Sequence, residues 1–213
     1  MAAGLTVVVD YGLCNIDSMV RALEECGATE VERARDPRTL ERADRIVLPG
    51  VGNFAAAMRN LQNIGLCETI RYCSAERKVP FLGACLGMQL MAQTGTEGAN
   101  GAPVEGLGLV AGEVVRLERQ SEDERIPHIG WNEVLQTNGC PMFRDLPQSV
   151  DFYFVHSYRM RLRDPGNEVG RTPYCGGFSS AIALTDRPVF GTQFHPEKSQ
   201  KNGFRLLRNF LAV

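Results

Sequence analysis

The sequence predicts an α/β protein with an open, mostly parallel sheet flanked by helices and additional β-rich segments in its second half. In the first half, short continuous apolar runs alternate with segments whose apolar residues recur at helical spacing. Such runs are typical of buried parallel strands, and their alternation with helices implies a sheet covered on both faces. From about residue 95 onward Gly and Pro become frequent, and short β-rich pieces replace the alternation.

The first strand is expected at residues 5–9, an apolar run near the start of the chain. The segment after it predicts a helix, because its apolar residues follow the i, i+3, i+4, i+7 rule: Ile16, Met19, Val20 and Leu23. Asn15 or Asp17 can cap this helix, and Gly27 ends it.

Two further strand–helix units follow. Residues 46–48 predict a buried strand that is closed by the segment Pro49-Gly50-Val51-Gly52, and the face of the next helix is marked by Phe54, Met58 and Leu61. Residues 79–82 predict the strand that leads to Cys85, and the helix behind it is marked by Leu86, Leu90 and Met91.

The second half predicts several strands and a closing helix. The strands are expected at residues 112–117, 131–135, 152–155, 181–184 and 189–193. They extend the first sheet or form a small companion sheet. The closing helix carries the apolar stripe Phe204, Leu207 and Leu211. At 213 residues, we expect a single domain, 1–213, with a substantial core.

Composition excludes several classes of function. The 23 basic and 25 acidic residues are near balance, so nothing favours binding to nucleic acid. No apolar stretch approaches the ~20 residues of a membrane span, and a strand-like run begins almost at once, so we expect neither a membrane segment nor a signal peptide. Seven cysteines without a Cys-x-x-Cys pair, and only three histidines, give no zinc-ligand spacing. We therefore expect a cytoplasmic protein with reduced thiols, no metal and no cofactor.

The most informative segment is residues 80–89, where an apolar run ends in Gly83-Ala84-Cys85-Leu86-Gly87 and a helical pattern follows. Glycines on both sides permit a sharp strand-to-helix turn that exposes the residue at its apex. The helix N-terminus favours a thiolate at that position. A lone cysteine after a strand is most often a buried core residue, but a core cysteine needs no such turn. The pattern therefore predicts Cys85 as a nucleophile.

A base for this nucleophile is available in His195-Pro196-Glu197, which follows a β run. His195 can lie at a strand end on the same edge of the sheet as Cys85, and Glu197 can accept from its imidazole and fix the tautomer. Acyl transfer also needs hydrogen-bond donors for an oxyanion. The backbone N–H of Leu86 can be one donor, and the segment Pro49-Gly50-Val51-Gly52 can supply another.

These residues match the motifs of a known family. Gly83-Ala84-Cys85-Leu86-Gly87 with His195-Pro196-Glu197 resembles the class I, triad-type glutamine amidotransferases. Further blocks, in the same order along nearly the whole chain, resemble one branch of that family, the glutaminase subunits of imidazole glycerol phosphate synthase. These blocks include Leu48-Pro49-Gly50-Val51-Gly52, Pro127-His128-Ile129-Gly130-Trp131-Asn132 and Tyr153-Phe154-Val155-His156-Ser157-Tyr158.

The resemblance implies that glutamine is hydrolysed to glutamate and ammonia, and that ammonia passes to a (β/α)8-barrel cyclase subunit in a heterodimer. It implies a triad of Cys85, His195 and Glu197. It also implies a set of residues around bound glutamine and its oxyanion: Gly50, Gly52, Leu86, Gln89, His156, Ser157 and Tyr158. Asn15, Trp131 and Lys198 would lie toward the partner. In one departure from the family, Cys14 takes the place of a usual glycine before Asn15.

Alternatives of different classes remain open at this point. A paralogous amidotransferase could deliver ammonia to another barrel partner for amidino-sugar synthesis in a surface-polysaccharide pathway. An inactive regulatory module could keep the fold, although such relatives typically lose the nucleophile or the histidine, and this chain has both. A cysteine hydrolase or a chaperone-like protein could share the turn, but neither would need the Pro-His-x-Gly-Trp block or Gln89.

Overall fold

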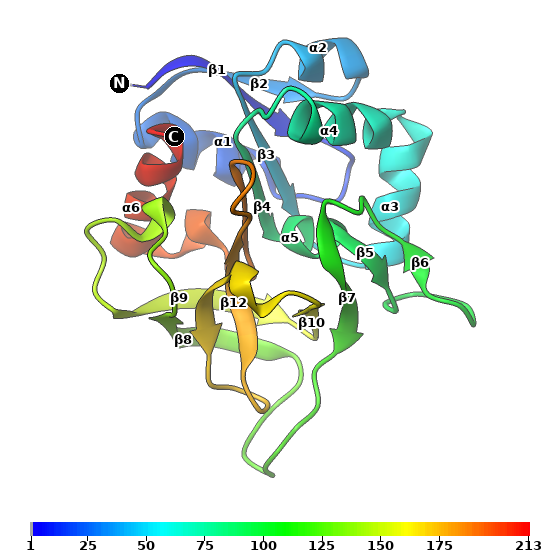
Figure 1. Ribbon diagram of the computed structural model, residues 1–213, viewed down its shortest axis with the longest axis vertical. Coiled ribbons are helices and arrows are strands. Elements are labelled where there is room, and N and C mark those ends of the chain that lie inside the picture. Colours follow the sequence, from blue (N-terminus) through cyan, green and yellow to red (C-terminus); the bar gives the residue numbers. More distant parts are fainter. Residues whose placement is uncertain (1) are drawn as a thin grey trace.

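The computed structural model describes residues 2–213 and shows a large mixed sheet flanked by helices, as predicted (Figure 1). Nine strands form this sheet, in the spatial order β2 (Ala28–Ala34), β1 (Ala2–Val9), β3 (Arg45–Gly50), β4 (Phe81–Cys85), β13 (Val189–Thr192), β12 (Phe178–Ala183), β11 (Glu168–Thr172), β8 (His128–Gln136) and β9 (Ser149–His156). Along this spatial order, neighbouring strands are parallel from β2 through β1, β3 and β4 to β13. They are antiparallel from β13 through β12, β11 and β8 to β9. The sheet is therefore parallel in only one of its halves.

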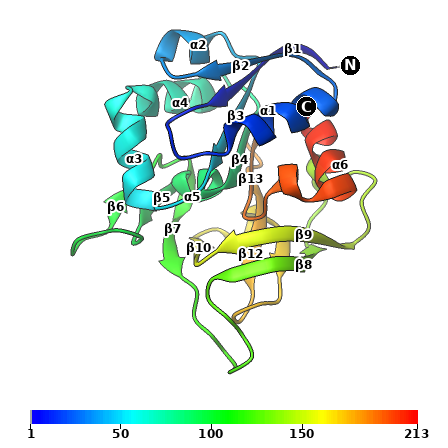
Figure 2. The same ribbon diagram turned by 180° about the vertical axis from the view of Figure 1, so that it is seen from behind.

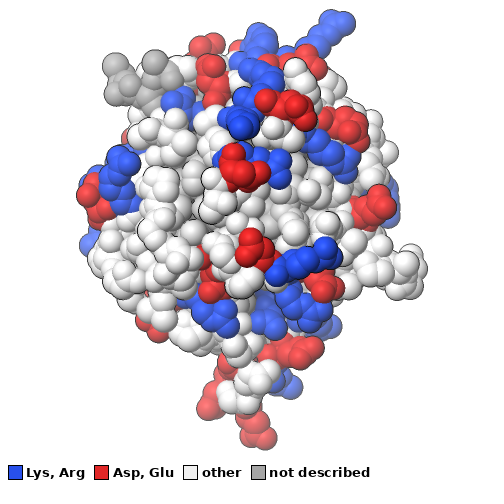
Figure 3. All heavy atoms as spheres, in the orientation of Figure 1, with Lys and Arg blue, Asp and Glu red and all other residues white. Residues whose placement is uncertain are grey.

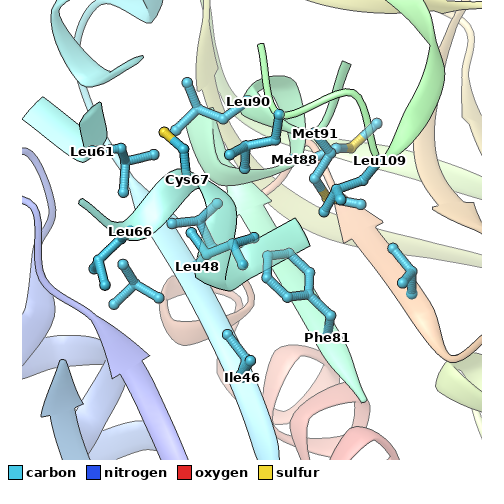
Figure 4. Packing of buried hydrophobic residues seen from close by; sticks show 14 of the residues in the cluster. Ile46, Leu48, Leu61, Leu66, Cys67, Phe81, Met88, Leu90, Met91 and Leu109 are labelled. Atoms are coloured by element: carbon cyan, nitrogen blue, oxygen red, sulfur yellow. The ribbon is translucent and has the colours of Figure 1, made fainter. Parts of the chain in front are cut away.

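Helices cover both faces of the parallel half, as the alternating pattern predicts. On one face lie α1 (Ile16–Glu25) and α6 (Gln200–Leu211), which Figure 2 shows next to each other. On the other lie α2 (Pro37–Glu41), α3 (Phe54–Asn63), α4 (Leu66–Ala75) and α5 (Leu86–Leu90). Alternate strand residues point to opposite faces, so Val47 packs with α1 and α6, whereas Ile46 and Leu48 pack with the second group (Figure 4).

Four strands form a smaller sheet, in the order β10 (Tyr158–Leu162), β7 (Val110–Arg116), β5 (Ala92–Gly95) and β6 (Val104–Glu105). Both arrangements expected for the later strands thus occur. The strand expected at residues 112–117 belongs to the small sheet, and the other four extend the large one. Three short 3-10 helices complete the fold: η1 (Pro141–Phe143), η2 (Pro165–Asn167) and η3 (Pro196–Lys198).

Several elements escaped the sequence analysis: β2, α2, α4, β5, β6, β10 and β11. The strand β2 shows why. It lies at an edge of the sheet and carries charged residues, whereas the strands predicted in the first half rest on continuous apolar runs. At α1, Asn15 occupies the N-cap position but its side chain makes no capping hydrogen bond, which corrects the expected role. Gly27 follows the helix with φ +102°, in agreement with the predicted end.

The described part of the chain contains no helix that is both long and apolar enough to cross a bilayer. Over the face in Figure 3, basic and acidic side chains are interspersed, as the balanced composition leads one to expect.

The turn between β4 and α5 brings two backbones into direct contact. A Cβ atom placed on Gly87 would lie 1.7 Å from the carbonyl oxygen of Leu48 in β3, and one on Gly83 would lie 2.5 Å from Sδ of Met91. Neither position has room for a side chain. The glycines around Cys85 are therefore required by packing as well as by the turn.

This contact predicts that Gly87→Ala is strongly destabilising. A methyl group cannot avoid the Leu48 carbonyl unless β3 or α5 moves, so we expect a loss of about 2–4 kcal/mol in the free energy of unfolding, measured by urea denaturation. Gly139→Ala is the matched control. Gly139 is exposed, its φ is not positive, and an added Cβ meets nothing within 4 Å, so the change should stay within about 0.5 kcal/mol. Equal stabilities for the two variants would contradict this account of the turn.

Candidate active site

Cys85 is the last residue of β4 and stands immediately before α5. Its backbone has φ +53° and ψ −112°, an uncommon conformation for a residue with a side chain. The side chain is nearly buried, with 5% of its surface exposed. In the sheet, Cys85 lies opposite Gly50 of β3. This strained apex is the geometry that the Gly-x-Cys-x-Gly pattern predicts.

His195 and Glu197 form a buried pair beyond the end of the neighbouring strand β13. The imidazole Nδ1 lies 2.8 Å from Oε1 of Glu197, and the two side chains are only 3% and 4% exposed. A carboxylate accepts, so Nδ1 carries the proton that it donates to Glu197. Among the described residues, Nε2 has no hydrogen-bond partner, which leaves it available to a reacting group. The predicted pairing of these two residues is therefore present.

The charge state of His195 depends on its neighbours. Burial by itself lowers the pKa of His195, but the negative charge of Cys85 and the hydrogen bond and charge of Glu197 outweigh burial and raise it to about 10. The imidazole and the sulfur are thus close enough for Cys85 to raise the pKa of the ring, although Nε2 has no partner at normal hydrogen-bond distance and angle among the described residues. His195 is held as an imidazolium facing the cysteine.

A cavity of about 290 Å³ opens at Cys85. It is lined by Val51, Gly52, Cys85, Leu86, Gln89, Glu97, Val155, His156, Ser157, Tyr158 and Lys198. Most of the residues predicted to surround glutamine are in this lining, and Lys198, predicted to face the partner, lies there too. Gly50 is outside the lining. A Cβ on it would lie 2.1 Å from the hydroxyl of Tyr11, so Gly50 makes room for that buried tyrosine.

Two backbone groups of the segment Pro49-Gly50-Val51-Gly52 are engaged by residues other than Cys85. The N–H of Val51 donates to the carbonyl of Leu13 over 2.8 Å, and the hydroxyl of Tyr11 donates to the carbonyl of Pro49 over 3.0 Å. Gly52 has φ +102° with open space around it. In this arrangement the Val51 donor is engaged elsewhere, and the segment holds a glycine that permits another orientation.

Two residues of the site were missed as site residues in the sequence analysis. Gln193, fully buried in the segment before His195, donates from Nε2 to Sγ of Cys85 at 3.9 Å and accepts from Gln89 at 3.0 Å. Its place two residues before His195 is the signal that could have found it. Glu97 lines the cavity and accepts from the N–H of Phe54 at 3.1 Å. It comes from a turn far from either motif, so no local pattern indicates it.

The other six cysteines lie in environments that keep them as thiols. Burial is the largest cause in every case, and it raises the pKa of Cys14 and of Cys26 to about 11. It also raises the pKa of Cys67, Cys73, Cys140 and Cys175. Cys14, which replaces the usual glycine, directs its thiol to the carbonyl of Val9 and to Asp10. All seven cysteines are unpaired.

An apolar face lies on β8 and β9 and adjoins the cavity, because Ile129 pairs with Val155, which lines the cavity. Trp131 is 48% exposed and packs edge-on to Tyr153, with ring centroids 6.1 Å apart, and Ile129 is 61% exposed. Trp131 is therefore a surface residue and not a core tryptophan. Asn15 is exposed at the start of α1. Within residues 2–213, no group of three or more His, Cys, Asp or Glu side chains is placed to hold a metal ion.

Comparison with known proteins identifies the family. The model of the class-I glutamine amidotransferase family matches residues 7–213. The imidazole glycerol phosphate synthase subunit HisH of Pseudomonas putida is 42% identical over 209 residues, which cover 96% of this chain and 95% of the relative. The HisH subunit of Moorella thermoacetica is 44% identical over 203 residues, which cover 95% of this chain and 92% of the relative.

Solved structures share the fold at lower sequence identity. One glutamine amidotransferase structure superposes with a TM-score of 0.74 at 21% identity, covering 97% of each chain. The structure of PurLQS from Thermotoga maritima gives a TM-score of 0.71 at 20% identity, covering 98% of this chain and 97% of that one. These likenesses show a common fold.

The electrostatic coupling in this site predicts that Cys85→Ala lowers the pKa of His195 well below about 10, because it removes the largest cause that raises it. An NMR titration of the imidazole measures the shift. Cys14→Ala, which removes a thiol that does not act on His195, should leave the pKa unchanged. An unaltered pKa in the Cys85 variant would refute the coupling.

The raised pKa of His195 also predicts how the stability of the folded state depends on pH. A raised pKa means that the folded state binds the proton more tightly than the unfolded state. The stabilisation is therefore complete below the unfolded pKa of ~6.5 and is lost as pH rises through about 10.

Proposed function

The chain belongs to the class I glutamine amidotransferases, and we propose that it is the glutaminase subunit of an imidazole glycerol phosphate synthase, which serves histidine biosynthesis. The observation that carries the proposal is the interaction of Cys85, which lines the cavity, with the buried His195–Glu197 pair, in a chain whose relatives over nearly its full length bear that name. The reaction is the hydrolysis of glutamine to glutamate and ammonia.

In the first step Cys85 attacks the side-chain amide of glutamine. A bond forms between Sγ and the amide carbon, and the carbonyl oxygen becomes an oxyanion. His195, held as an imidazolium, gives the proton on Nε2 to the amide nitrogen, and the carbon–nitrogen bond breaks to release ammonia. Glu197 keeps the other ring proton on Nδ1 and so presents Nε2 to the reaction.

In the second step water hydrolyses the glutamyl thioester. Neutral His195 takes a proton from the water through Nε2, oxygen bonds to the acyl carbon, and the carbon–sulfur bond breaks. Glutamate leaves, and the sulfur and the imidazolium return to their starting states. The absence of a partner on Nε2 among the described residues supports this double role, because the atom is free to meet either the leaving nitrogen or the water.

The cavity has the polar groups that an amino acid substrate requires. Gln89, Ser157 and Tyr158 line it with hydrogen-bonding groups, and Glu97 is the carboxylate among its lining residues. A glutamine molecule carries an α-ammonium group, for which Glu97 is a suitable acceptor. Burial raises the pKa of Glu97, and the hydrogen bond from the N–H of Phe54 acts in the opposite direction.

We infer that the oxyanion site is completed only when a partner binds. The N–H of Leu86 is one donor, but the N–H of Val51 is bound to the carbonyl of Leu13. Rotation of the peptide between Gly50 and Val51 would release the N–H of Val51 toward the oxyanion. A missing oxyanion donor typically costs about 10²–10³ in rate, so the free chain should be a poor glutaminase. Ammonia would then be released mainly when a partner can receive it.

The partner that suits this site is a (β/α)8-barrel cyclase subunit docked over the apolar face of Ile129, Trp131 and Tyr153, which lies beside the cavity. Ammonia is largely protonated in neutral water, so transfer through a sealed interface preserves its nucleophilic form. The names of the relatives favour the histidine pathway over the surface-polysaccharide alternative. The assembled cysteine, histidine and glutamate argue against an inactive module.

Replacement of the nucleophile tests the reaction. Cys85→Ala should abolish glutamine hydrolysis by the chain in complex with a histidine-pathway cyclase, because no thioester can form. Synthesis of imidazole glycerol phosphate from added ammonia should continue at the wild-type rate. Glutamate release and product formation are measured in the same samples. Substantial hydrolysis by this variant would exclude Cys85 as the nucleophile.

The docking face is tested by Trp131→Ala. An exposed aromatic residue at the centre of an interface often dominates the binding energy, so the affinity for the cyclase should fall by at least about tenfold. Titration with the cyclase gives the affinity, and the glutaminase stimulation should be lost in parallel. Tyr72→Ala is the control, because Tyr72 is a similarly exposed aromatic residue (52%) on α4, away from this face. Equal affinities for the two variants would place the interface elsewhere.

A further inference from the structure

Two buried histidines beside the cavity take no part in the mechanism above. His156 lines the cavity, and His128 lies behind it on the adjacent strand, in register with it. Nδ1 of His128 is 3.0 Å from Nε2 of His156, and both side chains are more than nine-tenths buried. Burial lowers the pKa of His128 to about 4 and that of His156 to about 3, so both rings are neutral.

The contacts of these rings determine where each proton lies. Nδ1 of His156 is 2.8 Å from the carbonyl of Tyr158, and a carbonyl can only accept, so this nitrogen carries the proton. Nε2 of His156 is then an acceptor, and His128 must donate to it from Nδ1. Nε2 of His128 is in turn an acceptor, and it lies 3.1 Å from Nδ2 of Asn132, which must donate. The oxygen of Asn132 accepts from the N–H of Glu133 at 2.9 Å, which fixes the amide in that orientation.

The inner end of this chain reaches the substrate-binding groups. The carbonyl of Tyr158 accepts from His156 and also from Nε2 of Gln89, each at 2.8 Å, so both of its lone pairs are used. Gln89 gives its second amide hydrogen to Gln193, which donates to Cys85. Because both hydrogens of Gln89 are used, its oxygen is the atom that it offers to a donor on the ligand.

We propose that Asn132, His128 and His156 form a one-directional hydrogen-bond relay that positions the Gln89 amide for glutamine through the Tyr158 carbonyl, with the direction set by this carbonyl at the inner end and by Asn132 at the outer end. The proposal rests on the proposed function for the identity of the ligand. All three are positioning residues, which act on glutamine through Tyr158 and Gln89. Asn132 is next to Trp131 in β8, so the relay begins at the strand that carries the apolar docking face and ends at the cavity.

The wild-type tautomers provide a direct test on the full-length chain. In ¹⁵N NMR spectra at neutral pH, His128 and His156 should both be neutral with the proton on Nδ1. A proton on Nε2 of either neutral ring, or a positive charge on either ring, would overturn the relay. This measurement needs neither activity nor a variant.

Asn132→Asp reverses the outer end of the relay with almost no change in shape. One carboxylate oxygen can still accept from the N–H of Glu133, but the other can only accept from Nε2 of His128, which must then carry a proton. The spectra should show that proton. KM for glutamine in the complex with the cyclase should rise by at least about tenfold, the size of effect expected when a buried donor or acceptor loses its partner. The change in kcat should be smaller, and ammonia-dependent synthesis should be unchanged.

Asn138→Asp is the control, since it makes the same change at an exposed asparagine outside the relay and should alter KM by less than about twofold. An Asn132→Asp variant with unchanged tautomers and unchanged KM would refute the relay while wild-type hydrolysis continued to support the proposed function. A wild-type complex that hydrolysed no glutamine would instead refute the proposed function, and the NMR result would still decide on the relay.

Discussion

The contact between Gly87 and the carbonyl of Leu48 is the constraint on which the rest of the site depends. The contact brings α5 against β3, and only the Cα hydrogens of Gly87 fit between the two backbones. The chain must therefore turn sharply at Cys85, between β4 and α5. The parallel neighbours β3 and β13 end at the same edge of the sheet, so Gly50 and the segment leading to His195 lie on the two sides of Cys85. A contact between backbones cannot be adjusted by a change of rotamer. The position of the nucleophile is thus set by the core of the sheet and not by flexible side chains.

Around one cavity, the protein maintains histidines in opposite charge states. The difference comes first from the charge of Cys85, which is the largest cause that raises the pKa of His195, and then from the group that accepts the Nδ1 proton of each ring. His195 donates to a carboxylate, which brings a full negative charge, whereas His156 donates to a backbone carbonyl, which brings none. Both rings are buried, so burial alone cannot separate them. The charge on His195 also lowers the pKa of His156. A single imidazolium therefore faces the sulfur, and the second ring remains a neutral link in a hydrogen-bond chain.

The sequence predicted the parts of the structure that have a local cause. The apolar runs of β3 and β4, the glycines around Cys85 and the His-x-Glu pair each depend on neighbouring residues, and the structure contains all of them. What could not be predicted depends on partners distant in the chain. The strand β2 is held at an edge by pairing with β1, although its own residues are mostly polar. Glu97 reaches the cavity only because its turn packs against the start of α3. The tautomers of His128 and His156 follow from a carbonyl and an amide that meet only in the folded sheet.

The environments of the cysteines have a consequence for selective chemistry. The reactive form of cysteine is the thiolate, and burial raises the pKa of six of the seven thiols in this protein. Cys85 is the cysteine that lines the cavity and interacts with the imidazolium of His195. An alkylating reagent that resembles glutamine should therefore react with Cys85 near neutral pH and leave the other six thiols unmodified. The labelling stoichiometry of the native chain would then count active sites, without removal of any other cysteine.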